Sequence, residues 1–327
     1  MIISRTPLRM SFVGGGSDLP SFYREFGGAV VSTAINKYVY VTVNPKFDHH
    51  TRISYSRTEE VETTEEIEHP LVRESMKMLG VKGGIEITSI ADIPSKGTGL
   101  GSSSSFTVGL LHALHAFQGR YASSDRLAQE ACEVEIGRCR EPIGKQDQYA
   151  AAFGGLNFIQ FHPDDTVSVD PIVCKPETLQ RLREDIICFY TGIIRSASGI
   201  LKAQQSTVSA DKAKQTMVKD MVKLAHDLRA ELQKNNVDAV GEVVHANWEL
   251  KRSLTADISS DQIDHWYATA RKNGATGGKL LGAGSGGFLM FCAPRERHEE
   301  IARGLEGLRR VDLGFEREGS KIIFVYD

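Results

Sequence analysis

The sequence predicts a two-domain protein of the α+β class, and three observations support this prediction. The chain has 327 residues, and a single hydrophobic core usually stops growing at about 250–300 residues. Its composition, 41% hydrophobic and 25% charged, is that of an ordinary globular protein. Segments with strand character and segments with helix periodicity occur in both halves. We place the domain boundary within residues 171–182 and expect domains at 1–175 and 176–327.

Charge and cysteine content exclude several kinds of partner. The formal net charge of -3 offers no electrostatic footprint for nucleic acid or for an anionic membrane. No stretch approaches the roughly 18 apolar residues of a membrane span. The five cysteines are odd in number and lack Cys-x-x-Cys spacing, which disfavours a disulfide framework and a zinc site. We therefore expect a cytoplasmic protein with no nucleic-acid or membrane partner.

The N-terminal half is expected to contain mainly strands, followed by helices. Residues 1–12 read as a strand that ends at glycines, and residues 30–43 are dominated by the strand-favouring Val, Thr, Ile and Tyr. A helix is expected from Ser102, because four apolar residues recur at helix spacing: Phe106, Leu110, Leu114 and Phe117. The other elements expected here are strands at 51–55, 84–90, 156–161 and 167–173 and a helix at 125–139.

The C-terminal half is expected to alternate strands with helices. A strand at 186–190 is followed by a long helix, whose apolar stripe comprises Met217, Met221, Leu224, Leu228 and Leu232. The remaining expected elements are helices at 237–250, 261–272 and 295–308, a glycine-rich turn at 282–287, and strands at 288–292 and 321–326. This alternation favours an α+β sandwich.

The strongest local signal is a strand-to-helix junction at 94–105, where three alternating glycines precede four serines. Glycines let backbone N–H groups approach a phosphate, and the N-terminus of the new helix carries a partial positive charge. A glycine turn with one serine cap would explain far fewer of these residues. The run lacks the ending of a Walker A loop and the spacing of a dinucleotide fingerprint. We predict a phosphate cradle made of Gly97, Thr98, Gly99, Leu100, Gly101, Ser102, Ser103 and Ser104.

Two further glycine clusters lie far from this junction in the sequence. Along the chain, the junction at 94–105 is the second of three glycine clusters. The first glycine cluster is Gly14-Gly15-Gly16-Ser17-Asp18, and the third glycine cluster extends from Gly277 to Gly287. So many glycines cost folding entropy, which favours a ligand close to the backbone. Lys279 lies in the third cluster, where we expect its charge to be solvated.

Carboxylates flank a Pro-Ile-Gly turn within residues 135–148. Glu135 lies on a predicted helix and Asp147 lies beyond the turn. Phosphoryl transfer needs a metal ligand and a residue that receives or orients the proton of the acceptor hydroxyl, and two converging carboxylates suit these tasks. The spacing alone slightly favours the alternative, a helix end with solvated charges.

Taken together, these motifs resemble those of the GHMP kinases, which include galactokinase, homoserine kinase, mevalonate kinase and phosphomevalonate kinase. The matching order begins at Thr6-Pro7-x-Arg9 and continues through the first glycine cluster, the loop at 97–105, the segment 135–148 and the third glycine cluster. It spans nearly the whole chain. The segments 14–18, 101–105, 144–148 and 190–195 are most similar to the branch of D-glycero-D-manno-heptose 7-phosphate kinases and L-fucokinases.

The resemblance implies an N-terminal domain like domain 2 of ribosomal protein S5 and a ferredoxin-like C-terminal domain, with ATP and a sugar in the cleft between them. Asp147 would be the base or orienter of the sugar hydroxyl, with Arg9 beside it to stabilise the carboxylate and the transferred phosphoryl group. Ser103 and Glu135 would hold Mg²⁺. Ser102 is the alternative to Ser103, and Glu133 is the alternative to Glu135. Asp18 matches the aspartate that binds sugar hydroxyls. The other expected substrate contacts are Gly14, Gly15, Gly16, Ser17 and Arg195, the last of which is equally well explained as part of a helix N-terminus.

One departure from the galactokinase pattern bears on the acceptor. Where galactokinase has an acidic residue used on the C6 hydroxyl of the sugar, this chain has Gly15. Loss of that carboxylate removes repulsion against a phosphate at the far end of the sugar, although an unphosphorylated deoxy sugar would not need the acid either.

The resulting hypothesis is a Mg²⁺-dependent and ATP-dependent sugar 1-kinase that acts on D-glycero-D-manno-heptose 7-phosphate. An L-fucokinase or another free-sugar 1-kinase is the nearest alternative. A non-catalytic sensor that binds ATP and sugar is a more distant one. The expected partners are thus ATP and a small sugar phosphate, and a homodimer stays open.

Overall fold

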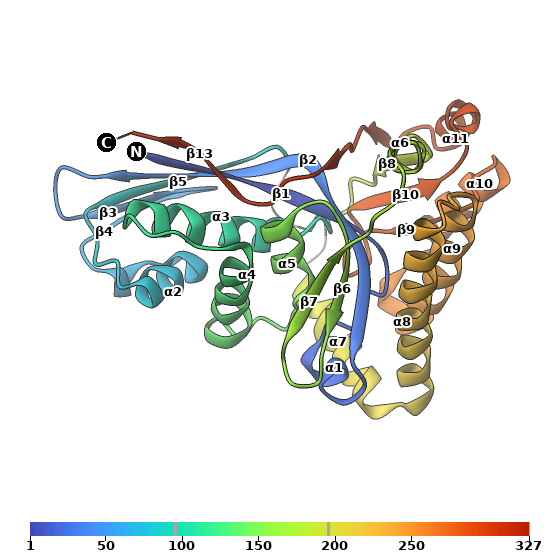
Figure 1. The fold of residues 1–327 in the computed structure, drawn as a ribbon, viewed down its shortest axis with the longest axis horizontal. Coiled ribbons are helices and arrows are strands. Elements are labelled where there is room, and N and C mark those ends of the chain that lie inside the picture. Colours follow the sequence, from blue (N-terminus) through green and yellow to red (C-terminus); the bar gives the residue numbers. More distant parts are fainter. Residues whose placement is uncertain (94–96, 195–196, 327) are drawn as a thin grey trace.

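The computed structural model describes residues 1–93, 97–194 and 197–326, and the strands of these ranges form two sheets (Figure 1). The larger, nine-stranded sheet comprises β1 (Ile2–Val13), β2 (Gly28–Pro45), β3 (Thr51–Ser54), β4 (Thr58–Val61), β5 (Ile85–Ala91), β6 (Leu156–Phe161), β7 (Val167–Pro171), β12 (Phe315–Glu316) and β13 (Lys321–Val325). The smaller sheet has the spatial order β11 (Arg309–Val311), β8 (Ile186–Tyr190), β10 (Phe288–Cys292) and β9 (Gly277–Leu280).

Strand β2 connects two parts of the larger sheet. It pairs with β1 along most of its length, with β6 through Gly28–Thr33 and with β5 through Val39–Pro45. The register of β1 against β2 shifts after Pro7, an irregularity that bends a strand locally. Strand β1, which includes Arg9, runs from the N-terminus into the middle of the molecule (Figure 1).

Helices cover one face of the outer part of the larger sheet (Figure 1). They are α2 (Pro70–Leu79), α3 (Ser102–Phe117), α4 (Ser124–Cys132) with the π-helical segment η2 (Glu133–Arg138), and α5 (Gln146–Phe153). Helix α3 approaches β1 closely at Gly109, where an added Cβ would lie 2.7 Å from Thr6 Oγ1. Ser4 Oγ also donates to the Gly109 carbonyl at 2.7 Å. These contacts fix the position of α3 relative to β1.

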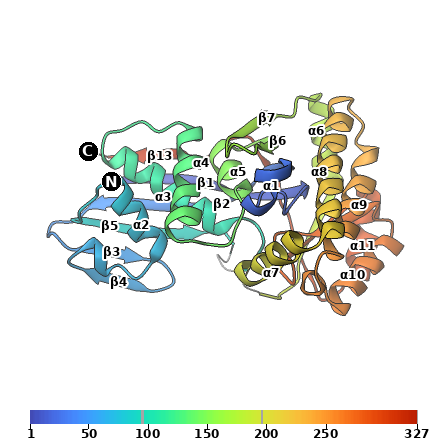
Figure 2. The ribbon, with the colours of Figure 1, turned by 90° about the horizontal axis from the view of Figure 1, so that it is seen from below.

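The remaining helices lie beside the smaller sheet or between the two sheets (Figure 2). They are α1 (Pro20–Phe26), α6 (Pro176–Glu184), α7 (Ala197–Ala210), α8 (Lys212–Gln233), α9 (Asp238–Arg252), α10 (Asp261–Lys272) and α11 (His298–Gly304). Three short 3₁₀ turns complete the description: η1 (Thr64–Glu66), η3 (Ala256–Ile258) and η4 (Arg295–Arg297).

Helix α8 belongs to both hydrophobic cores. Val218 and Met221 pack in the core of the smaller sheet, whereas Ala225, Leu228 and Leu232 pack in the core of the larger sheet. The two cores therefore share one rigid element. Among the helices of the described ranges, none combines the length and the apolar character needed to cross a bilayer.

Most expected elements are confirmed in type, but several details were wrong. The buried stripe of α8 includes Val218 and Ala225 rather than Met217 and Leu224, which are half-buried. The helix expected at 295–308 is shorter, because α11 ends at Gly304 and the chain then forms β11. Helices α1, α2, α5, α6 and α7 were not expected from the sequence.

The end of the chain returns to the first sheet. Strand β13 pairs with β1, and β12 pairs with β2, so the region expected as a C-terminal domain also supplies two strands to the N-terminal one. The boundary at residues 175 and 176 itself stays a prediction.

Candidate active site

A cavity of about 290 Å³ lies where the two halves meet, and both halves supply its lining. From the N-terminal half come Gly15, Gly16 and Asp18 of the first glycine cluster and the loop before α3. From the C-terminal half come α7, the end of α9, β9 and the third glycine cluster. Most of the residues predicted as functional from the sequence therefore meet in one place.

The loop before α3 is shaped as an anion cradle. Gly97, Gly99 and Gly101 have φ between 69° and 76°, a region that only glycine adopts readily. The first i→i−4 bond of α3 joins the Ser105 N–H to the Gly101 carbonyl at 2.9 Å. The three N–H groups that precede it, those of residues 102–104, lie at the positive end of the helix dipole, and these residues line the cavity.

The third glycine cluster supports this cradle. A Cβ on Gly99 would lie 2.3 Å from the Leu281 carbonyl oxygen, and a Cβ on Gly287 would lie 2.4 Å from the Thr98 carbonyl oxygen. These two glycines thus allow the two loops to pack closely against each other. Gly282 and Ala283 of the third cluster also line the cavity, so the expectation of a ligand close to this cluster stays a prediction.

Arg9 and Asp147 form a two-pronged ion pair at the cavity wall. Arg9 Nε donates to Asp147 Oδ1 at 2.7 Å and Arg9 Nη2 donates to Asp147 Oδ2 at 2.8 Å. The third guanidinium nitrogen, Nη1, donates to the Gly99 carbonyl at 2.6 Å. Arg9 is only 4% exposed, so the carboxylate at the start of α5 is held at a fixed orientation beside the cradle.

Asp18 is held by a second set of donors. The Gly16 N–H donates to Oδ1 at 3.0 Å, and the Gln146 side chain donates to Oδ2 at 3.0 Å. Burial, followed by the charge of Asp147, raises the pKa of the Asp18 carboxyl, and the hydrogen bonds from Gln146 oppose that rise. Gly144 is required beside it, because an added Cβ would lie 1.9 Å from Asp18 Oδ2.

Glu135 projects from the π-helical segment towards the serines of α3. Its carboxylate accepts hydrogen bonds from Ser103 Oγ at 3.0 Å, Ser104 Oγ at 2.7 Å and Gln148 Nε2 at 2.6 Å. None of these donors is charged, and burial raises the pKa of the Glu135 carboxyl to about 7. Glu133, by contrast, is exposed and lies 3.4 Å from the Arg138 guanidinium.

The residues around Glu135 fit a magnesium ion. Carboxylate and hydroxyl oxygens are the ligands that Mg²⁺ prefers. Ser102, Ser103 and Ser104 line the cavity, whereas Glu135 is fully buried behind the serines and does not line it. The buried Ser102 Oγ has no hydrogen-bond partner among the described residues. A buried carboxylate with only neutral donors and a buried hydroxyl without a partner would both gain from a bound cation.

Several predicted contacts do not reach the cavity. Ser17 is buried and its Oγ donates to the Gly14 carbonyl at 2.7 Å, while Gly14 packs against Ala29, so both shape the first cluster from behind. The Leu100 side chain is part of the hydrophobic core, although its carbonyl accepts from the Arg9 N–H at 3.0 Å. Arg195 lies outside the described residues. Gly15 and Gly16 do border the cavity.

Several side chains of the cavity were not expected from the sequence. They are Ser11, Gln146, Gln204 and Lys251, and Lys279 was wrongly expected to be solvated although it is 1% exposed. The signal for Lys279 was its position within an apolar strand, Leu280 and Leu281 following it directly. Lys251 offered no signal, because it follows the helical pattern of an ordinary charged last turn.

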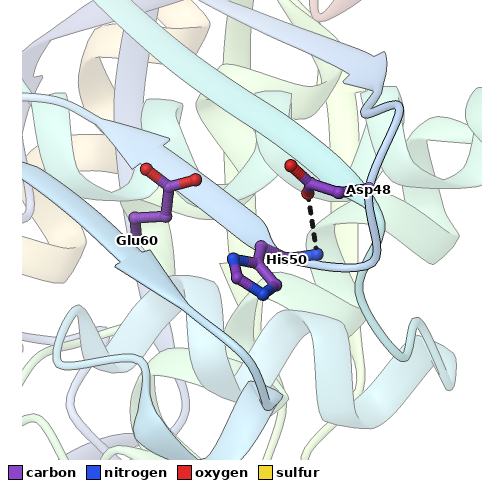
Figure 3. A group of neighbouring side chains, drawn as sticks. All are labelled: Asp48, His50 and Glu60. Carbon is purple, nitrogen blue, oxygen red and sulfur yellow. Dashed lines mark hydrogen bonds between the residues drawn. The ribbon is translucent and has the colours of Figure 1, made fainter.

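A second group of acidic and imidazole side chains is exposed at the far end of the larger sheet. Figure 3 shows Asp48, His50 and Glu60 close together. Lys46 Nζ lies 2.6 Å from Asp48 Oδ1 and 2.9 Å from Glu60 Oε1. The ammonium group satisfies both carboxylates, so this group is an exposed ion-pair network.

The main cavity has the parts of an ATP-dependent phosphotransferase: a cradle for phosphates, oxygen donors for a divalent cation and a carboxylate oriented by a guanidinium. The sequence matches the family models "GHMP kinases N terminal domain" at residues 67–155 and "GHMP kinases C terminal" at residues 228–308, together a little over half of the chain. The chain belongs to the GHMP kinase family. It is an ATP-dependent sugar kinase, and the two-domain fold expected from the resemblance is confirmed.

Relatives and solved structures agree with this assignment. The D-glycero-alpha-D-manno-heptose 7-phosphate kinase of Campylobacter jejuni is 27% identical, with 98% of each chain covered. The bifunctional fucokinase/GDP-fucose pyrophosphorylase of Arabidopsis thaliana is 25% identical over 94% of this chain and 31% of that longer protein. A D-glycero-D-manno-heptose 1-phosphate kinase structure from Bacteroides thetaiotaomicron shares the fold, with a TM-score of 0.82, 23% identity and full coverage of both chains.

Proposed function

We propose that the protein transfers the γ-phosphoryl group of ATP to the anomeric hydroxyl of D-glycero-D-manno-heptose 7-phosphate, which gives the 1,7-bisphosphate. The observation that carries this proposal is the Arg9–Asp147 pair, which borders one cavity together with the phosphate cradle and Asp18. The full-length similarity to the Campylobacter jejuni enzyme supports the choice of acceptor. The product suits the supply of nucleotide-activated heptose for a surface polysaccharide.

The side chains divide the reaction between them. Asp18 accepts hydrogen bonds from sugar hydroxyls and thereby orients the ring. The anomeric oxygen forms a bond to the γ-phosphorus while the bond from that phosphorus to the departing ADP oxygen breaks, and the hydroxyl proton passes to Asp147. Arg9 holds Asp147 in place and stabilises the charge on the transferred phosphoryl group.

Ser103 and Glu135 would hold Mg²⁺ beside the cradle. When bound, this ion neutralises charge on the ATP phosphates. The N–H groups at the start of α3 bind the same phosphates from the other side. In this proposal the ATP phosphates bind on the α3 side of the cavity and the sugar binds on the Asp18 side.

The second candidate is a free-sugar 1-kinase such as an L-fucokinase. It is favoured by the similarity to the fucokinase proteins of Arabidopsis thaliana and Bacteroides fragilis, at 25% and 26% identity. Those relatives cover most of this chain, so the acceptor must be decided by measurement.

The test is ADP release with Mg²⁺ and ATP against four acceptors: D-glycero-D-manno-heptose 7-phosphate, L-fucose, D-galactose and D-mannose. We expect turnover with the heptose phosphate alone, a ³¹P spectrum that shows a new anomeric phosphate, and loss of turnover in Asp147→Ala. Asp220→Asn, an exposed carboxylate on α8, is the matched control and should behave like wild type. Turnover with a free sugar would replace the proposal by the second candidate. Binding of ATP and sugar without ADP release would indicate a sensor.

A further inference from the structure

Two buried lysines from the C-terminal half line the cavity. Lys251, at the end of α9, is 4% exposed, and Lys279, on β9, is 1% exposed. Lys251 Nζ donates to the Gly282 carbonyl, and Lys279 Nζ donates to the Phe12 carbonyl at 3.2 Å. Within the described ranges no carboxylate oxygen lies within 4.0 Å of either nitrogen.

This arrangement is costly in the absence of an anion. Burial, together with the charge of Arg9, lowers the pKa of Lys251 to about 8, although the charges of Asp18 and Asp147 partly oppose this fall. Burial, together with Lys251 and Arg9, lowers the pKa of Lys279 well below its ordinary value. Three cationic side chains thus lie near one another, and only Arg9 has a paired carboxylate. Buried charges are normally paired, and a bound anion would supply the missing partner.

The position of both lysines favours the acceptor side of the cavity. A Cβ on Gly15 would lie 3.9 Å from Lys251 Nζ, and the Phe12 carbonyl that Lys279 contacts lies just before the first glycine cluster. Asp18, the expected sugar contact, belongs to the same cluster. The cradle for the ATP phosphates has its own donors at the start of α3.

A third donor lies against the same loop. Gln204, on α7, is 1% exposed and lines the cavity. Its Nε2 has no hydrogen-bond partner among the described side chains and backbone groups. It lies 2.2 Å from the place where a Cβ on Gly16 would stand, so the first cluster and α7 enclose one region.

We propose that Lys251, Lys279 and Gln204 form a subsite for the phosphate group that the acceptor already carries. This inference rests on the proposed function and deepens it, because it assigns the acceptor to the sugar phosphate monoesters. Two ammonium groups and an amide N–H supply charge and hydrogen-bond donors to a phosphate dianion.

The experiment compares one acceptor with and without its phosphate. In each protein we measure kcat/KM for D-glycero-D-manno-heptose 7-phosphate and for the unphosphorylated heptose, and take their ratio. Lys251→Met should lower this ratio by about 100-fold, the loss typical of removing one partner of a buried charge pair. Lys251→Arg should lower it less, and Lys223→Met, an exposed helical lysine on α8, should leave it unchanged. Because both acceptors are measured on one preparation, partial misfolding of a variant cancels in the ratio.

The outcomes separate this inference from the proposed function. An unchanged ratio in Lys251→Met, with both values lowered equally, would assign the lysine to the transferred phosphoryl group and overturn the subsite. If the wild-type protein does not phosphorylate the heptose phosphate but phosphorylates another sugar phosphate, the substrate proposal fails. The subsite is then tested by the ratio of kcat/KM for that sugar phosphate to kcat/KM for its unphosphorylated sugar. Wild-type preference for free sugars would overturn both.

Discussion

At the scale of single residues, the site contains buried ionisable groups that have no charged hydrogen-bond partner among the described residues. Glu135 has only neutral hydrogen-bond donors, and Lys251 donates to a backbone carbonyl. Each such charge costs stability in the free protein, because burial disfavours the ionised form. Sites of this kind commonly exchange stability for function.

The cost of Glu135 can be measured directly. Its folded-state pKa, about 7, lies above the ordinary value of 4.5, so the folded protein binds this proton more tightly than the unfolded chain. The carboxyl therefore adds no cost below pH 4.5, and the cost grows to about 3 kcal/mol as the pH rises through 7. We expect Glu135→Gln to raise Tm by several degrees at pH 8 in EDTA, with a smaller gain at lower pH, while turnover with Mg²⁺ and ATP is lost.

Glu133→Gln is the matched control for this prediction, since Glu133 lies on the same π-helical segment but is exposed. It should change neither Tm nor turnover. Thermal melts in EDTA across the pH range provide the measurement. A Tm of Glu135→Gln below that of wild type at pH 8 would contradict the assignment of Glu135 as an uncompensated buried carboxylate.

We expect acceptor binding to depend on pH through the protonation of Lys251. Arg9 adds to the burial that lowers its pKa to about 8, Asp18 and Asp147 oppose the shift, and Lys279 faces the same cavity. Below this pH Lys251 is an ammonium group that attracts a phosphate dianion, and above it the charge is lost. We expect kcat/KM for the phosphorylated acceptor to fall above pH 8, by up to about tenfold per pH unit. A profile for the unphosphorylated heptose should lack this decline, and identical declines for both acceptors would sink the prediction.

Gly15 leaves room for a phosphate near Lys251. Because its φ is not in the left-handed region and its nearest neighbours are side-chain ends, a side chain fits there. A carboxylate at this position would pair with Lys251 and repel a phosphorylated acceptor. We expect Gly15→Glu to raise KM for the phosphorylated acceptor at least about tenfold while KM for ATP is unchanged. Gly15→Gln, which adds similar bulk without charge, should have a much smaller effect, and equal effects would show that bulk alone matters.

At the scale of elements, the cradle depends on contact between two glycine loops. Gly99 and Gly80 both have φ near 70°, so alanine at either position is strained by about 1 kcal/mol. Only at Gly99 does the added Cβ also meet another loop, 2.3 Å from the Leu281 carbonyl oxygen. Around Gly80 nothing lies within 4 Å of the added atom.

We therefore expect Gly99→Ala to raise KM for ATP and to lower kcat by about tenfold or more, because a small misplacement of the phosphates is expensive in rate. Gly80→Ala should lose stability alone. Steady-state kinetics at saturating acceptor, with melting curves for both variants, make the comparison. Normal kinetics in folded Gly99→Ala would show that the third glycine cluster does not position the cradle.

At the scale of the whole molecule, the two sheets are expected to unfold together. Helix α8 packs in both cores, β12 and β13 return to the larger sheet, and Lys279 reaches from β9 to the Phe12 carbonyl. Because each core loses part of its packing when the other opens, we expect one calorimetric transition whose calorimetric and van't Hoff enthalpies agree. ATP and the phosphorylated acceptor should raise its Tm, since both bind the folded state. Two resolved transitions would show that the halves fold independently.

The parts of this protein that the sequence itself determined are those governed by local chemistry. Glycines before a serine-rich helix specify a cradle because left-handed turns and the helix dipole depend on neighbouring residues only. The roles expected for Arg9, Asp18, Glu135 and Asp147 came instead from the resemblance to the GHMP kinases, because the spacing of the carboxylates at 135–148 alone slightly favoured solvated charges. The tertiary structure alone decided that Ser11, Gln204, Lys251 and Lys279 share their cavity. Their burial arises when α7, α9 and β9 pack against the first glycine cluster. The leucines that follow Lys279 were a local sign of its burial, but the helical pattern around Lys251 does not distinguish a lysine that distant segments will enclose from one that will be solvated.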